Sequence, residues 1–228
     1  MMLHQAYDDS HAAGLCSDTM YLDWIRKLHD EKKNFILDSA LKAYPSCGPL
    51  WCLYVAHTGS SHENFQRAIK SSDDKTISVV WMQYLEWIAK EADSMGSAVF
   101  DEALNNANLS EQAEQILDMY VNWAQLVGIE TLRNVVDAQH KKRPLTTSFL
   151  KRILSIEASI ESPDPQRISR LWELAHNADM NNVDTWIAHI KFEMDNGAPT
   201  VAARVYWRAQ KNVGDVEDLN RRYQAIKC

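Results

Sequence analysis

Residues that interrupt helices are scarce in this sequence. Only seven glycines and six prolines occur among its 228 residues, and few segments alternate polar and apolar residues as half-buried strands do. A β-sandwich or barrel needs frequent turns between short strands, so neither is indicated. The composition predicts an all-α protein that forms one large domain or two small ones.

Positive charge, long apolar runs and cysteine are also limited. The formal net charge is −7, which is the wrong sign for a general polyanion binder. No uninterrupted apolar run of about 18 residues occurs, and no secretory leader pattern opens the chain. The four cysteines are Cys16, Cys47, Cys52 and Cys228, few enough to indicate reduced thiols. We expect a protein of the cytosol or nucleus that does not enter a membrane.

The motifs of common catalytic and cofactor sites are missing. There is no G-x-S-x-G, no phosphate-binding glycine loop and no H-E-x-x-H. One spacing resembles a metal site, because Cys47, Cys52, His57 and His62 recur every five residues. Five residues of helix turn through about 140°, so Cys52 and His57 would point apart rather than converge on zinc. We therefore predict no enzyme, no metal, no cofactor and no small-molecule substrate.

What the sequence does contain is a repeated pair of amphipathic segments. In residues 183–194 apolar side chains recur at offsets of 0, 3, 4, 7 and 11, and residues 202–213 repeat those offsets. Each set forms one face of an α-helix. Between the two segments, Gly197 can cap the first helix and Pro199 can begin the second. This pattern predicts a helical hairpin.

The same hairpin recurs along the chain. The first-helix positions are Tyr21, Trp51, Trp81, Leu117, Leu150 and Trp186, followed three residues later by Trp24, Tyr54, Tyr84, Tyr120, Ile153 and His189. A small residue recurs on the second helix at Ala40, Ala68, Ala103, Ala138, Ala175 and Ala209. A period of about 34 residues with two helices per unit is typical of a TPR-like solenoid.

The expected organisation is an α-solenoid of about six hairpins over residues 18–228, with residues 216–227 as a C-terminal capping helix. Residues 1–17 are interpreted as an N-terminal segment, either frayed or part of a preceding helix. Ser60-x-x-Glu63 is interpreted as a capping box, and Asp164-Pro165 as a helix start. The aromatic ladder is expected in the core rather than on a base-stacking surface. Trp207 either lies against the terminal helix or marks a contact surface.

Charge is unevenly distributed between the two halves. The candidate acidic face consists of Glu91, Asp93, Asp101, Glu102, Glu111, Glu114 and Asp118. The candidate basic patch follows it and consists of Lys141, Lys142, Arg143, Lys151 and Arg152. These charges either form a solvated surface, with Lys141–Arg143 complementing a helix dipole, or bind partners. In the second case the acidic face would dock a basic segment and the basic patch would touch RNA or an acidic protein.

The hairpin resembles the half-a-TPR (HAT) repeat. Its first-helix motif, W-x2-Y-x2-[FW]-E, is similar to Trp186-x2-His189-x2-Phe192-Glu193 and to Trp81-x2-Tyr84-x2-Trp87, where Ile88 replaces the acid. The second-helix motif is similar to Ala203-Arg204-Val205-Tyr206-Trp207-Arg208-Ala209. The resemblance covers roughly residues 20–211 and implies a scaffold in eukaryotic RNA processing.

The Y-W-R-A run at Tyr206–Ala209 resembles the C-terminal region of the U3 small nucleolar RNA-associated protein 6 family. That resemblance implies a nucleolar, nuclear scaffold that binds proteins of the small-subunit processome during ribosomal RNA processing, with indirect or weak RNA contact. Two alternatives stay open. One is a HAT scaffold of pre-mRNA splicing or polyadenylation, and the other is a module that binds RNA directly through residues 141–152.

Overall fold

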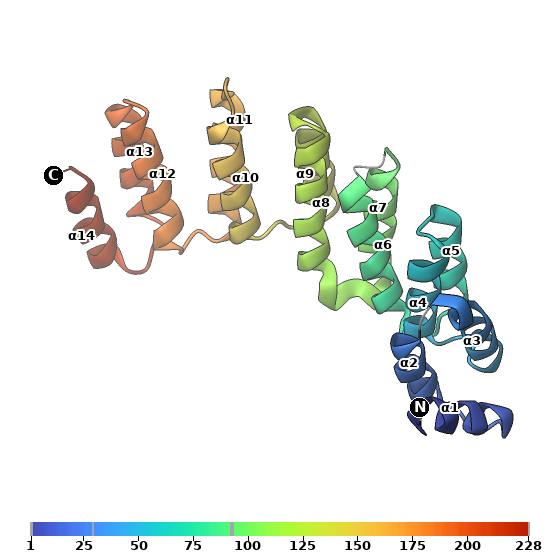
Figure 1. The fold of residues 1–228 in the computed structure, drawn as a ribbon. Coiled ribbons are helices and arrows are strands. Elements are labelled where there is room, and N and C mark those ends of the chain that lie inside the picture. Colours follow the sequence, from blue (N-terminus) through green and yellow to red (C-terminus); the bar gives the residue numbers. More distant parts are fainter. Residues whose placement is uncertain (1, 29, 92–93, 228) are drawn as a thin grey trace. The chain divides into compact units, whose positions relative to one another are not determined.

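The protein is all-α in the parts that its structure describes. The structure is a computed structural model that describes residues 2–28, 30–91 and 94–227. Every regular element in these ranges is helical (Figure 1). The chain divides into two compact units, unit 1 (Met1–Val135) and unit 2 (Val136–Cys228). Within the described ranges, no helix combines the length and the apolar character that a membrane crossing requires.

The helices follow one another with short connections. Unit 1 contains α1 (Met2–Ala12), α2 (Asp18–Lys27), α3 (Asp30–Ala43), α4 (Gly48–Thr58), α5 (His62–Ser71), α6 (Ile77–Glu91), α7 (Gly96–Asn105), the 3-10 helix η1 (Ala107–Gln112) and α8 (Ala113–Val127). Helix α9 (Ile129–Lys142) begins in unit 1 and ends in unit 2. Unit 2 adds α10 (Thr147–Ser159), α11 (Pro165–Ala178), α12 (Val183–Asp195), α13 (Pro199–Ala209) and α14 (Val216–Lys227).

Neighbouring helices pair as hairpins, and the hairpins pack on one another. In unit 1, α2 contacts α3, α4 contacts α5 and α6 contacts α7. The first helices also contact each other, α4 with α6 and α6 with α8. In unit 2, α10 pairs with α11 and α12 with α13, and α14 covers α12. Each repeat thus buries its apolar face against its neighbours, which is how solenoids are stabilised. The predicted all-α solenoid of helical hairpins is confirmed.

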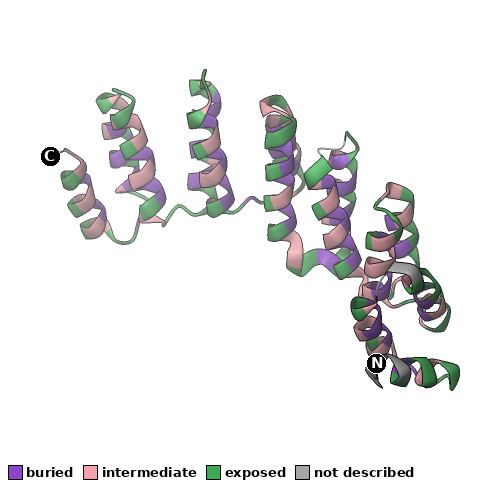
Figure 2. Ribbon diagram, viewed as in Figure 1, coloured by how far each residue is buried: buried purple, intermediate pink, exposed green. Residues whose placement is uncertain are grey.

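The aromatic ladder forms the core of the hairpins. Figure 2 shows buried residues recurring along the helices of both units. All six first-helix positions are buried, and of the residues three positions later only Tyr54 is half-buried. Aromatic rings also stack between successive hairpins. Phe65 of α5 stacks on Tyr84 of α6, and Phe100 of α7 stacks on Tyr120 of α8, each with 4.7 Å between ring centroids. These side chains are therefore packed in the core and do not form a base-stacking surface.

The small position of the second helix is correctly predicted in five hairpins and wrong in the fourth. Ala40, Ala68, Ala103, Ala175 and Ala209 are fully buried. Ala138, in contrast, is only half-buried, and its neighbour Gln139 is fully buried. Leu132, Val135, Val136 and Gln139 repeat the spacing of Ala202, Val205, Tyr206 and Ala209. The buried position of α9 therefore carries a glutamine, and the search for alanine selected the adjacent residue.

A glycine lets α7 and α8 of unit 1 approach closely. Gly96, the first residue of α7, is buried beneath Trp123 of α8. A Cβ atom at position 96 would overlap the indole ring of Trp123. Glycine is therefore required here for side-chain clearance, since its backbone conformation is not of the positive-φ kind.

The helix starts agree with the sequence with one correction. Asp164 accepts hydrogen bonds from the backbone N–H groups of Gln166 and Arg167, and Pro165 begins α11, as predicted. The capping box placed at Ser60 was wrong by one residue. The N-cap of α5 is Ser61, whose hydroxyl accepts from the Asn64 N–H at 3.2 Å. Gly59 precedes it at a φ of 111° and ends α4.

The terminal helix packs on the last hairpin through Tyr206. Tyr223 of α14 stacks on Tyr206 with 3.9 Å between ring centroids. The Tyr206 hydroxyl donates a hydrogen bond to Asn220 at 2.7 Å. Trp207 is 63% exposed and contacts Tyr206 edge-on. Of the two alternatives for Trp207, the structure favours an exposed surface position.

Two histidines form a buried neutral pair in unit 2. The rings of His176 in α11 and His189 in α12 are 2.9 Å apart, Nε2 to Nδ1. His176 stacks on Trp186 and His189 on Trp172. The pKa of each ring is lowered to about 3, mainly by burial, and the charge of Arg208 contributes to the lowering at His176. Both rings are therefore neutral at physiological pH.

The hydrogen bonds of the pair assign its tautomers. His189 Nε2 lies 3.3 Å from the Glu193 carboxylate, which can only accept. His189 Nε2 therefore carries the proton and its Nδ1 is the acceptor. It follows that His176 donates through Nε2, and that its buried Nδ1 is the unprotonated nitrogen. This arrangement has no room for an additional proton without breaking a hydrogen bond or charging a buried ring.

We expect Gly96→Ala to destabilise unit 1, because the new methyl group overlaps the Trp123 ring. Overpacking of this kind typically destabilises a protein by about 1–3 kcal/mol. Replacing glycine by alanine in a helix stabilises it by at most about 1 kcal/mol, so a net loss is expected. Urea unfolding followed by tryptophan fluorescence measures the loss. Ala98→Ser, an exposed change in the same helix, is the control. An unchanged midpoint for Gly96→Ala would show that the two helices are not in close contact.

The histidine pair makes stability depend on pH below neutrality. The unfolded rings titrate near 6.5 and the folded rings near 3, so the unfolded state binds more protons between these values. Stability is complete above pH 6.5 and falls as the pH is lowered towards 3, by up to about 1.4 kcal/mol per pH unit for each ring. We expect the double variant His176→Phe, His189→Tyr to lose this part of the pH dependence. Urea unfolding at pH 8, 6 and 5 compares the slopes, and equal slopes would contradict the assignment.

Candidate functional site: a groove between α9 and α11

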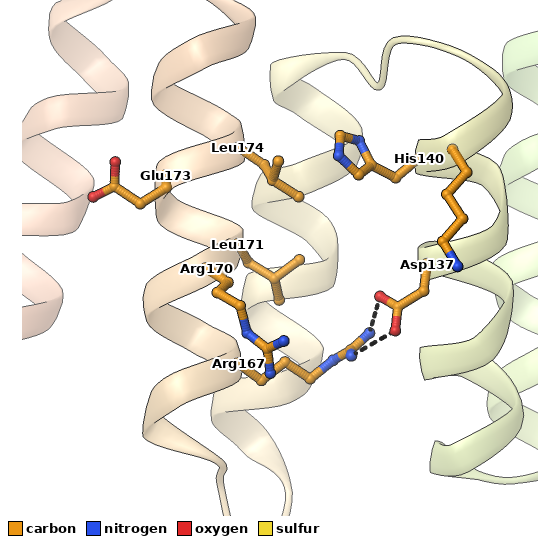
Figure 3. A pocket seen from close by; sticks show the side chains of 8 residues that line it. Asp137, His140, Arg167, Arg170, Leu171, Glu173 and Leu174 are labelled. Atoms are coloured by element: carbon orange, nitrogen blue, oxygen red, sulfur yellow. Dashed lines mark hydrogen bonds and ion pairs between the residues drawn. The ribbon is translucent and has the colours of Figure 1, made fainter.

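Two adjoining cavities of unit 2 form a groove between the end of α9 and the outer face of α11. Their volumes are about 400 and 320 Å³, and they share His140 and Leu174. The larger cavity is lined by Asp137, His140, Lys141, Arg167, Arg170, Leu171, Glu173 and Leu174. Figure 3 shows Leu171 and Leu174 of α11 directed across the space towards the helix that carries Asp137 and His140.

The groove changes character along its length. The end near Arg170 is lined by charged side chains, and the smaller cavity is lined mainly by Pro144, Leu145, Leu150, Leu174 and Ala178. Leu145 and Leu150 are buried core residues, so this end opens onto the apolar interior of unit 2. A ligand lying along the groove would thus meet charges at one end and an apolar surface at the other.

Arg167 holds together the three helices that shape the groove. Its Nε donates to Glu157 of α10 at 2.8 Å, and its two terminal nitrogens donate to the Asp137 carboxylate of α9 at 3.1 Å each (Figure 3). The Glu157 side chain is completely buried, whereas that of Asp137 is 57% exposed. Buried charges need such partners, because removing them from water costs several kcal/mol per ion. The ion pairs therefore fix α9, α10 and α11 in one arrangement.

The groove carries charges of both signs. Asp137 shares the single positive charge of Arg167 with Glu157, and Glu173 accepts hydrogen bonds from both terminal nitrogens of Arg208 at 2.7 and 2.8 Å. His140, Lys141 and Arg170 are exposed and make no ion pair among the described residues. At neutral pH the groove therefore presents two cations, Lys141 and Arg170, with a histidine beside them.

The predicted basic patch lies in unit 2, and its five residues differ in exposure. Lys141 enters the groove, and Lys142 is exposed in the same last turn of α9. Arg143 and Arg152 are half-buried. Lys151 lies near α12, because its charge adds to the effect of Arg222 in lowering the pKa of Asp184. Whether these five residues bind a partner stays a prediction.

The predicted acidic residues lie in unit 1. Glu111, Glu114 and Asp118 are exposed along one side of η1 and α8. Glu102 and Glu91 are exposed on α7 and α6, and Asp101 is half-buried. Asp93 lies outside the described residues. Glu114 and Asp118 are four residues apart on α8 and therefore lie on the same face of that helix. Whether the acidic residues bind a partner stays a prediction.

No group of three or more His, Cys, Asp or Glu side chains among the described residues is placed to hold a metal ion. Cys47 and Cys52 are half-buried free thiols, and burial raises the pKa of Cys52 to about 11. A thiol in this state is protonated at neutral pH and is a poor metal ligand. His62, which followed the same five-residue spacing, instead lies 2.6 Å from the Tyr84 hydroxyl. Cys228 lies outside the described residues.

Sequence analysis did not identify Arg167, Arg170 or the histidine pair as parts of one region. Glu157 occupies the acidic position of the repeat motif, seven residues after Leu150. Its burial implies a cationic partner on the next helix, and Arg167, in the first turn after Asp164-Pro165, was the nearest choice. That signal was available. The groove itself was not predictable, because it depends on how far α9 and α11 are apart.

We expect Arg167→Met to destabilise unit 2 strongly, because it removes the guanidinium that pairs with the buried Glu157 carboxylate at 2.8 Å. Breaking a buried pair from one side typically costs about 3–5 kcal/mol. The double variant Arg167→Met, Glu157→Leu should recover most of that loss, since it removes both charges. The control is Lys27→Met, which breaks an exposed pair with Asp23 that solvent screens. Urea unfolding tests this, and similar losses in the single and double variants would refute the coupling.

Known proteins resemble this chain over most of its length. The family model described as "U3 small nucleolar RNA-associated protein 6 C-terminal" matches residues 1–213, which include the groove. A human protein named "U3 small nucleolar RNA-associated protein 6 homolog" is 26% identical over 153 residues, which is 64% of this chain and 25% of the relative. The chain thus spans about a quarter of the length of that curated relative. By this match, the chain belongs to the U3 small nucleolar RNA-associated protein 6 family and corresponds to its C-terminal region.

Proposed function

We propose that this chain is a non-catalytic scaffold of ribosomal RNA processing that binds proteins of the small-subunit processome in the nucleolus. The observation that carries this proposal is membership of a family described as associated with U3 small nucleolar RNA, over residues 1–213. The alternative scaffolds of splicing and polyadenylation lack this support.

The architecture suits positioning rather than chemistry. The hairpins are held by buried first-helix side chains, most of them aromatic, and by small residues on most of the second helices, so partner-binding residues on the surface lie on a rigid frame. Exposed charges then determine which partners bind and in which register. The groove of unit 2 and the acidic stripe Glu111, Glu114 and Asp118 are the two surfaces that we propose for this purpose.

RNA contact is proposed to be indirect or weak. The net charge of −7 opposes the counterion release on which tight polyanion binding depends. Of the five residues of the predicted basic patch, Lys141 and Lys142 are exposed, whereas Arg143, Lys151 and Arg152 are half-buried. U3 RNA would then be reached through partner proteins.

A pull-down of the tagged chain from nuclear extract tests the proposal, with sequencing of the RNA and mass spectrometry of the proteins. We expect U3 RNA and pre-ribosomal RNA to be enriched together over a tag-only control. Digesting the extract with RNase before capture should leave the processome proteins bound, because the contacts are between proteins.

Other results would contradict the proposal in specific ways. Enrichment of spliceosomal RNAs or polyadenylation factors would place the scaffold in another pathway. Loss of every captured protein after RNase digestion would indicate direct RNA binding. If neither U3 RNA nor processome proteins are captured above the tag-only level, the proposed function is rejected altogether.

A further inference from the structure

We propose that the groove between α9 and α11 binds a short segment of a partner protein in which an acidic side chain lies within a few residues of leucine-like apolar side chains. This inference rests on the proposed scaffold function and goes further, because it names the surface used and the chemistry of the partner.

The dimensions of the groove suit a peptide segment. The two adjoining cavities, of about 400 and 320 Å³, fall in the usual size range of binding pockets. Along α11 the groove extends from Arg170 to Asn177, seven residues of helix or about 10 Å. An extended chain covers this distance in about three residues, and a helix does so in about two turns.

Charge complementarity determines one end of the segment. Of the two acids of the larger cavity, Glu173 is paired with Arg208, and Asp137 shares the charge of Arg167 with the buried Glu157. Lys141 and Arg170 therefore face the groove as cations, and His140 adds a polar ring that can donate or accept a hydrogen bond. An aspartate or glutamate of the ligand would be paired at this end.

The apolar end of the groove favours a protein over an RNA as the ligand. Pro144, Leu145, Leu150, Leu174 and Ala178 present an apolar surface continuous with the cationic end. Burying the apolar side chains of a peptide at this end is favourable, whereas burying a ribose–phosphate chain there is not. The net charge of −7 likewise opposes RNA.

The groove is also preorganised. Arg167 ties α9, α10 and α11 together through Asp137 and the buried Glu157. Binding of a ligand therefore does not require these helices to be ordered, and no free energy of the contacts is lost to that ordering. Arg167 acts here by positioning the walls, whereas Lys141 and Arg170 contact the ligand.

Site-specific photo-crosslinking identifies the occupant. Benzoyl-phenylalanine replaces His140, which lies where the two cavities meet, and the tagged chain is irradiated in nuclear extract. We expect a crosslink to one partner-protein segment that carries an acidic residue within about four positions of leucine-like residues. The matched control carries the same group at Lys191, an exposed position of α12 that lines neither cavity. This control should not capture that segment.

Charge reversal tests the same contact quantitatively. The segment identified by crosslinking is synthesised with a fluorescent label, and its affinity for the purified chain is measured by anisotropy. Lys141→Glu with Arg170→Glu should weaken binding by about tenfold or more, since two attractions become repulsions. Lys191→Glu with Lys211→Glu makes the same net change on exposed residues outside the groove and should leave the affinity within about twofold. Equal unfolding midpoints verify that both variants fold.

Each remaining outcome rejects the inference. A crosslink to RNA, to another segment of this chain, to a segment without acidic residues or to nothing would do so, as would equal affinities for the two charge-reversal variants. The failure of the scaffold function is detected separately. If the chain captures U3 RNA but the groove variant captures it equally well and His140 yields no crosslink, the function stands and the groove is not the site. If the unmodified chain captures no U3 RNA or processome protein, the function itself fails.

Discussion

Close approach between an aromatic helix and a helix with small residues is the constraint on which this structure depends. Ala40, Ala68, Ala103, Ala175 and Ala209 are all fully buried, and Ala40 and Ala209 share core clusters with the first-helix rings Trp24 and Trp186. A larger side chain at any of these positions would separate the two helices and expose apolar surface that each hairpin cannot bury alone. The Gly96–Trp123 contact is the same constraint in a stricter form, because there even a Cβ atom does not fit.

The packing of small residues against large apolar side chains is modified mainly in α9 to α12, where polar side chains are buried in the core. Gln139 replaces the small residue, Glu157 is buried against Arg167, and His176 pairs with His189. Each of these groups stabilises the fold only while its partner is in place, since a buried polar group without a hydrogen bond is costly. This part of unit 2 therefore has more specific geometry than an apolar core would require, and the groove lies beside it.

The fold could be predicted from the sequence because it follows from periodicity. The helical spacing of the aromatic residues, the breakers at Gly197-Pro199 and the cap at Asp164-Pro165 each act locally, so residue spacing alone reveals them. The errors have physical causes. A small residue is expected on the second helix, but helical phase places Gln139 rather than Ala138 at the buried position, and the hydroxyls of Ser60 and Ser61 are equally suited to cap a helix. The groove could not be predicted, since its charges come from α9 and α11, whose separation no local pattern encodes.

A repeated core also explains why function must be sought in residues that do not repeat. Positions that recur in every hairpin are used for packing, and a surface built from them alone would present similar grooves at every step of the solenoid. Lys141, Arg170 and His140 are exposed and have no role in the core, so their cost to stability is small and they are available to distinguish one groove from the next. Arg167 connects the two sets of residues, because the side chain that neutralises buried Glu157 also aligns the walls on which these exposed groups stand. Specific recognition in this chain would then depend on the same ion pairs that keep its polar core folded.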